Sequence, residues 1–576
     1  MELFVFSYDY FLRRGRVKIV AMLLELCVLL FIMGCSTFLI ACIDYQKVLH
    51  LRSNESIIIG ECWYHIPIIW LIFLWSFFLF FILQCIQFLQ SIPMIMRMHD
   101  FYSDYLDIKD EDLTTMSWDY IAKKIIHVVN NHSEFISKHQ TEDFLVQSIM
   151  RKENYMIALF NHMDPSIKIG GMSILGLSLE WNITACVLGL LGNNSFLHQS
   201  NEQLTEKLKK RFRAMAVING LLLPLIAVFL LMYIFFRYAE EIKRSPGTIL
   251  SRQYSRYAKY LLRQYNELPH LFQQRLNKSF EHAVLYVGQF PNETYIAFAR
   301  FFAFICSALL TMLLFLAFLN QDVLTHLLIY DQTPLFYIGL LGSLIAITRN
   351  MIPDEHVSFT PETHANKVIE YIQYSPTHWT NKLHTKQIYR EFCILFPLKL
   401  EVLLHEIISL ILTPFMLWKT FHDKSEEIID FLKEISIDHQ ELGIICKFGC
   451  FEMTANDNKM EASMLNFKKD YPLWDLDENV LSEYPNDQVI NNLKASVHLQ
   501  PPHLERPTTA TETPPSKLDT IPPMKVPTPP KRVPTDALIM NDELDLPFAQ
   551  VQSKFKPHVK KELQKPFNLS ASERKK

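Results

Sequence analysis

One apolar stretch, residues 214–236, most constrains what this chain can fold into. It reads AMAVINGLLLPLIAVFLLMYIFF, which is long enough to cross a bilayer, since a crossing takes about 20 residues. Pro224 lies in its middle, where a proline removes a backbone donor and crowds the preceding turn. Basic residues flank both ends, whereas a simple span has its Lys and Arg excess on one side. We therefore predict a re-entrant segment that kinks at Pro224 and returns. Irregular backbone at membrane depth must be covered by protein or face a wet cavity, so a cavity is implied.

The composition is that of an integral membrane protein with a soluble tail. Hydrophobic residues make up 49% of the 576 residues and are gathered in long runs, and the last part of the chain has none of these runs. Basic residues form no single stripe, so nucleic-acid binding is not indicated. Most of the ten cysteines fall in apolar runs and are interpreted as small buried hydrophobes. Only Cys62, in a loop expected to face the lumen, is placed where it would oxidise.

The region 1–100 is predicted to hold a cytosolic N-terminus and a first transmembrane hairpin, about 17–43 and 66–90. Arg13, Arg14 and Arg16 precede the first span and place the N-terminus in the cytosol. Glu25 lies inside that span, where a carboxylate either faces a functional partner or reaches the nearby interface. The loop between the spans carries a possible glycosylation site at Asn54.

Two glutamines near the end of the second span, Gln84 and Gln87, lie at helical spacing with Gln90. They form a polar stripe on one face of the helix. Such side chains hydrogen-bond between helices, or they line a path for lipid headgroups. Both interpretations stay open.

Residues 101–296 are predicted to form a cytosolic helical region around the re-entrant segment. Charged helices are expected at 118–129 and 142–160, and a buried or interfacial helix within 170–192. Residues 237–297 hold nine Lys or Arg against five Glu, which indicates the cytosolic side. A helix over 252–280, with an aromatic stripe, is expected to lie against the membrane surface or a neighbouring subunit.

The second half of the chain adds a hairpin and a tail. Region 297–349 contains two spans, 298–319 and about 324–348, joined by a short turn. Region 350–455 is cytosolic and helical, with a second Pro-interrupted segment at 407–418 that contains Pro414 and is too short to span. Residues 456–576 are rich in Pro pairs and are predicted to be a disordered tail.

Several motifs resemble those of the autophagy-related protein 9 family. They lie in one order across residues 1–455: Asn154-Tyr155-Met156, the run YAEEIKRSPG at 238–247, Tyr265-Asn266-Glu267-Leu268, Arg275-Leu276-Asn277, Ile352-Pro353-Asp354-Glu355-His356 and Thr413-Pro414. Two positions depart from the family pattern. Ser245 stands where many relatives have an acid, and Leu410 stands where a Ser-Pro pair is usual.

The resemblance implies an all-α integral membrane protein with four transmembrane helices and two re-entrant, Pro-kinked segments. It implies a domain-swapped homotrimer with both termini cytosolic, on vesicles derived from the Golgi and endosomes and on the preautophagosomal membrane. It also implies an ATP-independent phospholipid scramblase, without a cofactor, that receives lipid from bridge-like lipid-transfer proteins and works with other autophagy factors. A vesicle scaffold without intrinsic lipid transport is the alternative.

Candidate lipid-path residues follow from the chemistry of a zwitterionic headgroup. Cations hold phosphate and carboxylates meet ammonium groups, and both kinds of residue cluster where the kinked segment ends. The candidates are Arg237, Glu240, Glu241, Lys243, Arg244, Gln84 and Gln87. The other interpretation of the charged ones is interfacial anchoring.

Four further patterns carry weaker hypotheses. His326 and Asp331 have the spacing of a membrane acyltransferase, without its other motifs. His439, Cys446 and Cys450 fit no standard zinc spacing, so no metal site is predicted. Phe548 and Val551 resemble a tail motif that binds ubiquitin-like autophagy modifiers. The run 8–11, YDYF, is similar to a sorting signal. No Walker A motif occurs, which argues against an ATP-driven flippase.

Overall fold

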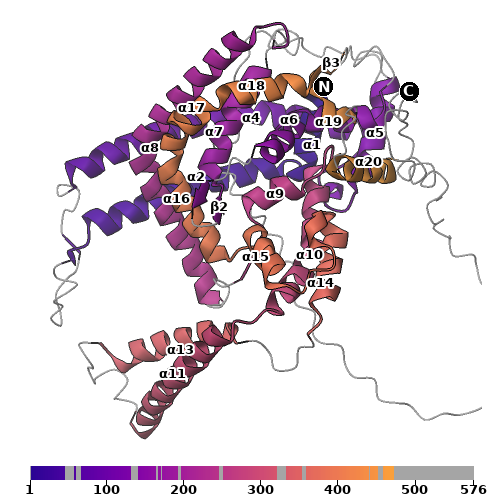
Figure 1. The fold of residues 1–576 in the computed structure, drawn as a ribbon. Coiled ribbons are helices and arrows are strands. Elements are labelled where there is room, and N and C mark those ends of the chain that lie inside the picture. Colours follow the sequence, from indigo (N-terminus) through magenta and orange to yellow (C-terminus); the bar gives the residue numbers. More distant parts are fainter. Residues whose placement is uncertain are drawn as a thin grey trace, which may run out of the picture. The chain divides into compact units, whose positions relative to one another are not determined.

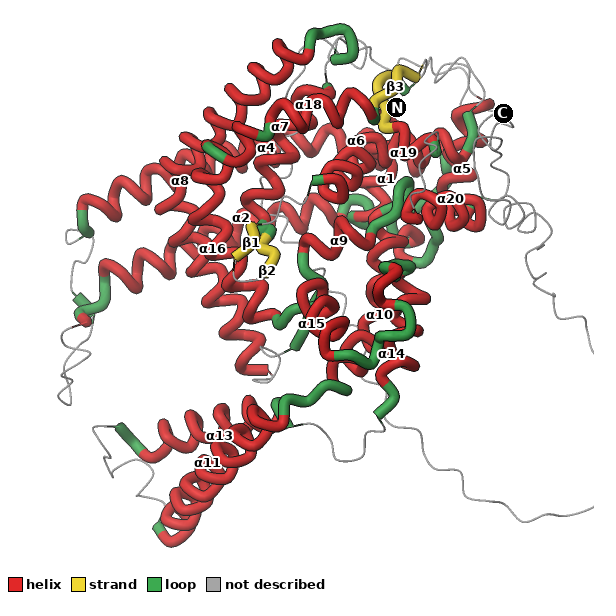
Figure 2. The backbone as a smooth tube through the Cα atoms, in the orientation of Figure 1, coloured by secondary structure: helices red, strands yellow, loops and turns green. Residues whose placement is uncertain are grey.

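The computed structural model describes most of the chain before residue 472. The described residues are 2–45, 58–59, 66–131, 140–163, 167–169, 172–192, 196–244, 251–320, 332–352, 359–439, 442–451 and 458–471. The chain divides into two units, 1–485 and 486–576, and every described residue lies in the first. Helices dominate this unit, and strands occur only as two short hairpins among the described residues (Figure 2).

The first predicted hairpin is present. After α1 (Glu2–Leu12), helix α2 (Val17–Ala41) packs against α4 (Ile68–Asp100). Leu29 and Met33 of α2 form a buried cluster with Trp70 and Phe77 of α4, and apolar residues of α8 pack on it. Burial of these side chains stabilises the hairpin.

Short elements lead from this hairpin into the next helices. A π-helix (Phe101–Tyr105) and a 3₁₀ turn (Asp112–Thr114) precede α5 (Trp118–Asn131) and α6 (Glu142–His162). Strands β1 (Ile167–Ile169) and β2 (Met172–Ile174) pair in antiparallel fashion, and α7 (Leu177–Leu191) follows. The predictions of charged helices at 118–129 and 142–160 are confirmed, and of the two alternatives for 170–192, buried or interfacial, the helix found is buried.

The re-entrant prediction for 214–236 is wrong in its local geometry. One continuous helix, α8 (Asn201–Arg244), contains the whole stretch, with Pro224 inside it. A proline costs one helical hydrogen bond, and its ring presses on the carbonyl of the residue four positions earlier. That residue is Gly220, which has no side chain to crowd the turn, so the helix passes through the proline.

The region predicted as one helix over 252–280 is instead two helices. Helix α9 (Arg256–Leu262) ends before Asn266, whose φ is +58°, and α10 (Pro269–Gly288) begins with a proline in its first turn. The predicted aromatic stripe is buried rather than presented to a membrane: Tyr254 is 7% exposed and Tyr265 3%. Tyr254 belongs to a core built with α14 (Pro361–Ile372), a 3₁₀ turn (Thr377–Trp379) and α15 (Lys386–Leu395).

The second hairpin consists of α11 (Glu293–Leu319) and α13 (Pro334–Asn350), which lie along each other (Figure 1). The predicted turn and the start of the second span, 321–331, lie outside the described residues. Only Ala299, Cys306 and Ala317 of α11 are buried, and most of its phenylalanines are exposed.

The second Pro-interrupted segment is longer than predicted. Helix α16 (Lys399–Trp418) begins eight residues before the apolar run, and Pro414 lies in its last turns. Figure 1 shows α16 beside α8. Helices α17 (Thr420–Asp423) and α18 (Ser425–Glu434) continue the chain.

The chain after residue 435 is not all helical, and one helix lies within the predicted tail. Strands β3 (Ser436–His439) and β4 (Gly443–Cys446) pair, α19 (Lys447–Cys450) follows, and α20 is a helix over Asn458–Asp470. Helix α20 falls inside the predicted disordered tail, yet it buries Met460, Met464 and Phe467.

Among the described residues, five helices are long and apolar enough to cross a membrane. They are Val17–Leu39, Phe73–Tyr105, Asn201–Leu231, Glu293–Leu319 and Lys399–Asp423. Three correspond to predicted spans and two to the segments that the sequence suggested were re-entrant. Helix α13 is apolar but shorter.

Candidate functional site

The predicted lipid-path residues fall in two places. The backbone of 237–244 continues α8 to its end, but the side chains of Arg237, Glu240, Glu241, Lys243 and Arg244 lie outside the described residues. Gln84 and Gln87 are half-buried on α4. Asn54, Phe548 and Val551 also lie outside the described residues, as do His326 and Asp331.

The two proline-containing helices meet each other. A Cβ placed on Gly220 of α8 would lie 3.9 Å from Pro414 Cβ of α16, which is ordinary van der Waals contact. Pro224 itself is exposed, whereas Pro414 is half-buried. The sequence predicted each kink separately and had no means of predicting that the two helices are neighbours.

Polar side chains join α7 to α8 at the level of this contact. Asn182 and Asn219 exchange amide hydrogen bonds: Asn219 Nδ2 donates to Asn182 Oδ1 at 2.7 Å, and Asn182 Nδ2 donates to Asn219 Oδ1 at 3.2 Å. Each amide also donates to its own helix, to Met215 O and Ser178 O respectively. Asn182 is fully buried. Paired amides hold two helices in one register, because each would lose its partner on sliding.

A second set of polar contacts joins α7 to α16. Ser409 Oγ accepts a hydrogen bond from Gly176 N at 3.1 Å, and Glu406 Oε2 accepts one from Leu177 N at 2.8 Å. The first backbone N–H groups of a helix lack intrahelical acceptors, so α16 satisfies donors at the start of α7. Thr413 and Ser409 are both fully buried, and Thr413 Oγ1 donates a hydrogen bond to Ser409 O within α16.

An arginine connects three elements at this point. Arg256 Nε donates to Glu406 Oε1 at 2.7 Å, and Arg256 Nη1 lies 3.3 Å from Glu180 Oε2. Tyr260 donates to Glu180 Oε1 at 2.7 Å. The three charged side chains are only 15–20% exposed. Helices α7, α9 and α16 are thus held together by one cation between two carboxylates.

The two carboxylates of this network stabilise the positive charge of Arg256. Burial by itself lowers the pKa of Arg256, but the carboxylates of Glu406 and Glu180 outweigh it and raise the pKa above the usual range. The pKa of Tyr260 is raised, first by burial and then by Glu180. Both groups therefore keep their protons at physiological pH, and Tyr260 stays a donor.

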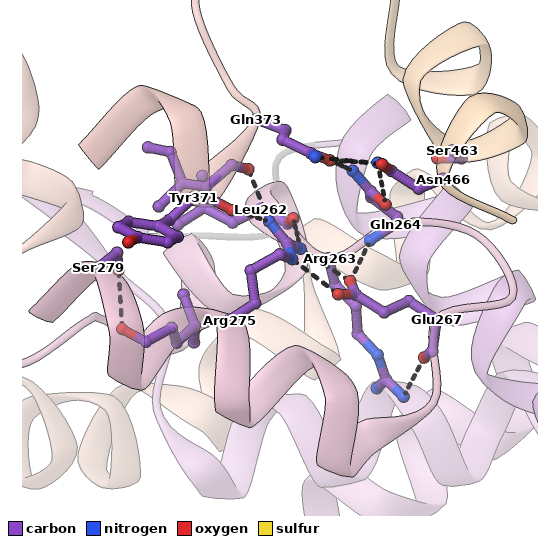
Figure 3. Close-up of polar contacts among 12 residues, drawn as sticks. Leu262, Arg263, Gln264, Glu267, Arg275, Ser279, Tyr371, Gln373, Ser463 and Asn466 are labelled. Atoms are coloured by element: carbon purple, nitrogen blue, oxygen red, sulfur yellow. Dashed lines mark hydrogen bonds and ion pairs between the residues drawn. The ribbon is translucent and has the colours of Figure 1, made fainter. Parts of the chain in front are cut away.

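A separate hub involves the motifs at 265–268 and 275–277 (Figure 3). Glu267 accepts two hydrogen bonds from Arg275, from Nε and Nη2, each 2.7 Å long. Arg275 also donates to Leu262 O, Tyr371 O and Ile372 O, which are carbonyls at the ends of α9 and α14. One guanidinium therefore caps two helices.

The hub also fixes the turn between α9 and α10. Asn266, in the left-handed region, donates to Gly449 O at 2.6 Å and accepts from Asn154 Nδ2 at 2.7 Å. The motifs around Asn154, Asn266 and Arg275 thus hold the fold together.

Two minor sequence hypotheses are contradicted by the structure. Tyr8 and Tyr10, in the run resembling a sorting signal, are 4% and 2% exposed, so they are packing residues. Cys42 is disulfide-bonded, with a partner outside the described residues, and is not the free buried thiol that we expected. Among the described residues, no group of three or more His, Cys, Asp or Glu side chains is placed to hold a metal ion.

Sequence reasoning missed the polar contacts between the apolar helices. Glu180 had a visible signal, because it interrupts an apolar segment. Asn182, Asn219 and Glu406 had none beyond being polar residues in or beside apolar runs, because their partners are distant in the sequence.

Comparison with known proteins points in one direction. A family model described as autophagy protein ATG9 matches residues 2–452. Autophagy-related protein 9 of Coccidioides immitis is 34% identical over 482 residues, which is 79% of this chain and 52% of that protein. The Saccharomyces cerevisiae protein of the same name is 34% identical over 478 residues, covering 79% and 48%.

A solved structure is also similar. The cryo-EM structure of Schizosaccharomyces pombe Atg9 matches with a TM-score of 0.59 at 29% identity, covering 78% of this chain and 98% of that one. The chain spans about half the length of the curated relatives it matches.

Proposed function

Since this chain belongs to the autophagy-related protein 9 family, we propose that it is an ATP-independent phospholipid scramblase that moves lipids between the leaflets of autophagy vesicles. One observation carries the proposal. Helices α8 and α16 are both apolar enough to cross a membrane, yet both reach their neighbour α7 through polar groups, Asn219 and Ser409. The activity needs neither a cofactor nor a covalent step.

The physical task is to lower the cost of a polar headgroup in hydrocarbon. That cost is several kcal/mol for each unpaired polar group. Helices that carry polar side chains at membrane depth offer partners to a headgroup or to the water around it. The lipid tails need no protein partner, because they remain in the bilayer.

We place the lipid path along α8 toward its C-terminal end. Arg237, Lys243 and Arg244 supply cations for phosphate, and Glu240 and Glu241 supply carboxylates for an ammonium group. The departure at Ser245, where many relatives have an acid, leaves these two glutamates as the acidic partners there. Gln84 and Gln87 of α4 extend the path to the first hairpin.

The test is lipid flipping in proteoliposomes, followed by dithionite quenching of a fluorescent lipid. The K243L/R244L variant should slow flipping several-fold compared with the wild type. Its matched control is K209L/K210L, which removes two charges at the other end of the same helix and should leave the rate unchanged. Equal rates for K243L/R244L and the wild type would refute the assignment of these residues.

The assembly is proposed to be a domain-swapped homotrimer. Support comes from the α11–α13 hairpin, whose outer surface exposes Phe304 by 74% and Phe318 by 85%. Lipid or a neighbouring subunit must cover these rings. A mass measurement in detergent tests the trimer.

The location and orientation are also proposals. Disulfides persist on the oxidising side of a membrane, so the bonded Cys42, just after α2, supports a lumenal loop there and a cytosolic N-terminus. We propose that both termini are cytosolic and that the protein resides on Golgi- and endosome-derived vesicles and the preautophagosomal membrane. Bridge-like lipid-transfer proteins and other autophagy factors are the proposed partners.

A vesicle scaffold is the second candidate function. It is favoured by α20, which packs on the helical core through buried side chains and precedes the Pro-rich residues in the chain. Deleting 472–576, which spares α20, separates the two functions. A scramblase whose tail recruits partners would keep flipping and lose recruitment. A scaffold alone would show no flipping in the full chain.

A further inference from the structure

Glu25 and Gln87 lie level with each other on the first hairpin. Two contacts set the register of the antiparallel pair: Trp70 Nε1 donates to Thr37 Oγ1 at 3.3 Å, and Ser91 Oγ lies 3.5 Å from Met22 Sδ. Counting one turn inward from the Met22–Ser91 contact reaches Glu25 on α2 and Gln87 on α4.

The two side chains also lie on the same edge of the hairpin. On α2, Glu25 is three residues after Met22 and four before Leu29, both buried against α4, and it is itself exposed. On α4, Gln87 is ten residues after the buried Phe77 and is half-buried. Each polar residue is rotated from its buried stripe in the same sense, and in antiparallel helices that places both on one side of the seam.

This polar pair lies within two of the helices that are long and apolar enough to cross a membrane, Val17–Leu39 and Phe73–Tyr105. Lys18, near the start of α2, forms an ion pair with Asp9 of α1, and Glu25 lies seven residues further in, about 10 Å along a helix. One turn beyond Glu25 on α2, Leu29 belongs to the buried apolar cluster, against which Leu225 of α8 packs. The polar edge therefore ends where the helix of the proposed lipid path, just past its proline, meets the hairpin.

We propose that Glu25 and Gln87 form a binding site for the headgroup of a zwitterionic phospholipid at the entry to the lipid path. This rests on the proposed scramblase function. The Glu25 carboxylate attracts the ammonium group, and the Gln87 amide donates to the phosphate. Coulombic attraction is stronger at this depth than in bulk water, because the surrounding dielectric constant is lower.

The site predicts selectivity between lipid classes. Phosphatidylcholine and phosphatidylethanolamine carry an ammonium group, whereas phosphatidylglycerol carries the phosphate alone. In proteoliposomes, E25Q should slow flipping of the first two lipids roughly tenfold, the size of one charged contact. It should leave phosphatidylglycerol within about twofold of the wild type. Q87L should slow all three lipids, because the phosphate is common to them.

The control variant is L24Q. Leu24 is 59% exposed and lies on the opposite side of the helix from the buried Met22, so L24Q adds a polar group outside the site and should flip all three lipids as the wild type does. The elution volume in detergent shows whether each variant is folded. If E25Q does not fold, E25A replaces it in the flipping assay.

The outcomes separate the two proposals. If the wild type moves no lipid, the scramblase function fails and takes this site with it. If the wild type moves lipid and E25Q matches it, only the headgroup site is overturned. Equal slowing of all three lipids by E25Q also overturns it, since that result indicates a structural role. If Q87L flips all three lipids at the wild-type rate, the assignment of Gln87 to the phosphate is overturned.

Discussion

Gly176 lies against Ser409 so closely that a Cβ at position 176 would be 2.4 Å from Ser409 Cβ. Real Cβ atoms do not approach so near, and the neighbouring atoms are on a packed helix. The contact fixes how close α7 lies to α16, and with it the position of Asn182 opposite α8.

The first prediction concerns this contact. G176A should destabilise the protein by about 1–3 kcal/mol, because overpacking a close contact forces the helices apart. A lower melting temperature in detergent would report it. G220A is the matched control: its Cβ would meet Pro414 at an ordinary 3.9 Å, so its melting temperature should stay near that of the wild type. A G176A protein as stable as G220A would contradict the packing described.

The second prediction concerns Arg256, the cation between Glu180 and Glu406. R256M should cost about 3 kcal/mol, because it leaves two carboxylates buried without their partner. The triple variant R256M/E180Q/E406Q, which removes all three charges, should recover part of that loss. Melting in detergent gives both values. If R256M melts as the wild type does, the network contributes no stability.

Much of the membrane architecture could be predicted from the sequence. Long apolar runs with basic flanks located α2, α4 and α11, and the interruption of the apolar segment 170–192 at Glu180 predicted a buried or interfacial helix, which is α7. Apolar runs and their flanking charges are properties of neighbouring residues, so they can be identified from one sequence.

The errors share a physical cause. The missing N–H of Pro224 suggested a break, and the glycine four residues earlier matters only once the segment is known to be helical, so a continuous α8 was not predicted. Helix α16 begins with the mixed run KLEVLLHE, which hides its true length. The polar contacts Asn182–Asn219 and Arg256–Glu406 join residues far apart in the chain, and nothing in one sequence pairs them.

The third prediction is that the stability of α1 depends on pH through the contact between Tyr8 and His270. Burial lowers the pKa of His270 to about 4, and its Nδ1 shares a hydrogen bond of 2.8 Å with the Tyr8 hydroxyl. The histidine is therefore neutral in the folded state, whereas its pKa in the unfolded chain is about 6.5. The neutral histidine therefore contributes to the free energy of unfolding fully above about pH 6.5. This contribution, at most about 3 kcal/mol, is lost as the pH falls toward 4.

Hydrogen exchange of the amides in α1 measures this effect. After correction for the intrinsic rate, protection of residues 4–10 should be weaker at about pH 5 than at about pH 7. The H270Q variant cannot take up the proton, so its protection should be the same at both values. Equal loss of protection in H270Q would assign the effect to another group.

The last prediction concerns α20, the helix within the predicted tail. Its buried residues Met460, Met464 and Phe467 follow i, i+4, i+7 spacing, and Ser463 Oγ accepts a hydrogen bond from Tyr265 N at 3.2 Å. Asn466 reaches the hub through Gln264 and Gln373 (Figure 3). The stripe is hard to see in the sequence, because polar and charged residues surround it.

M464D should release α20 from the core, because it replaces a fully buried apolar side chain with a carboxylate that is costly to take out of water. We expect residues 458–470 to lose hydrogen-exchange protection while α8 and α16 keep theirs. K469D, which places the same side chain on the exposed face of the helix, is the matched control and should keep α20 protected. Because α20 contacts the turn that Glu267 and Arg275 fix, its release should also loosen 263–268. Full protection of α20 in M464D would show that this helix is not held by its apolar face.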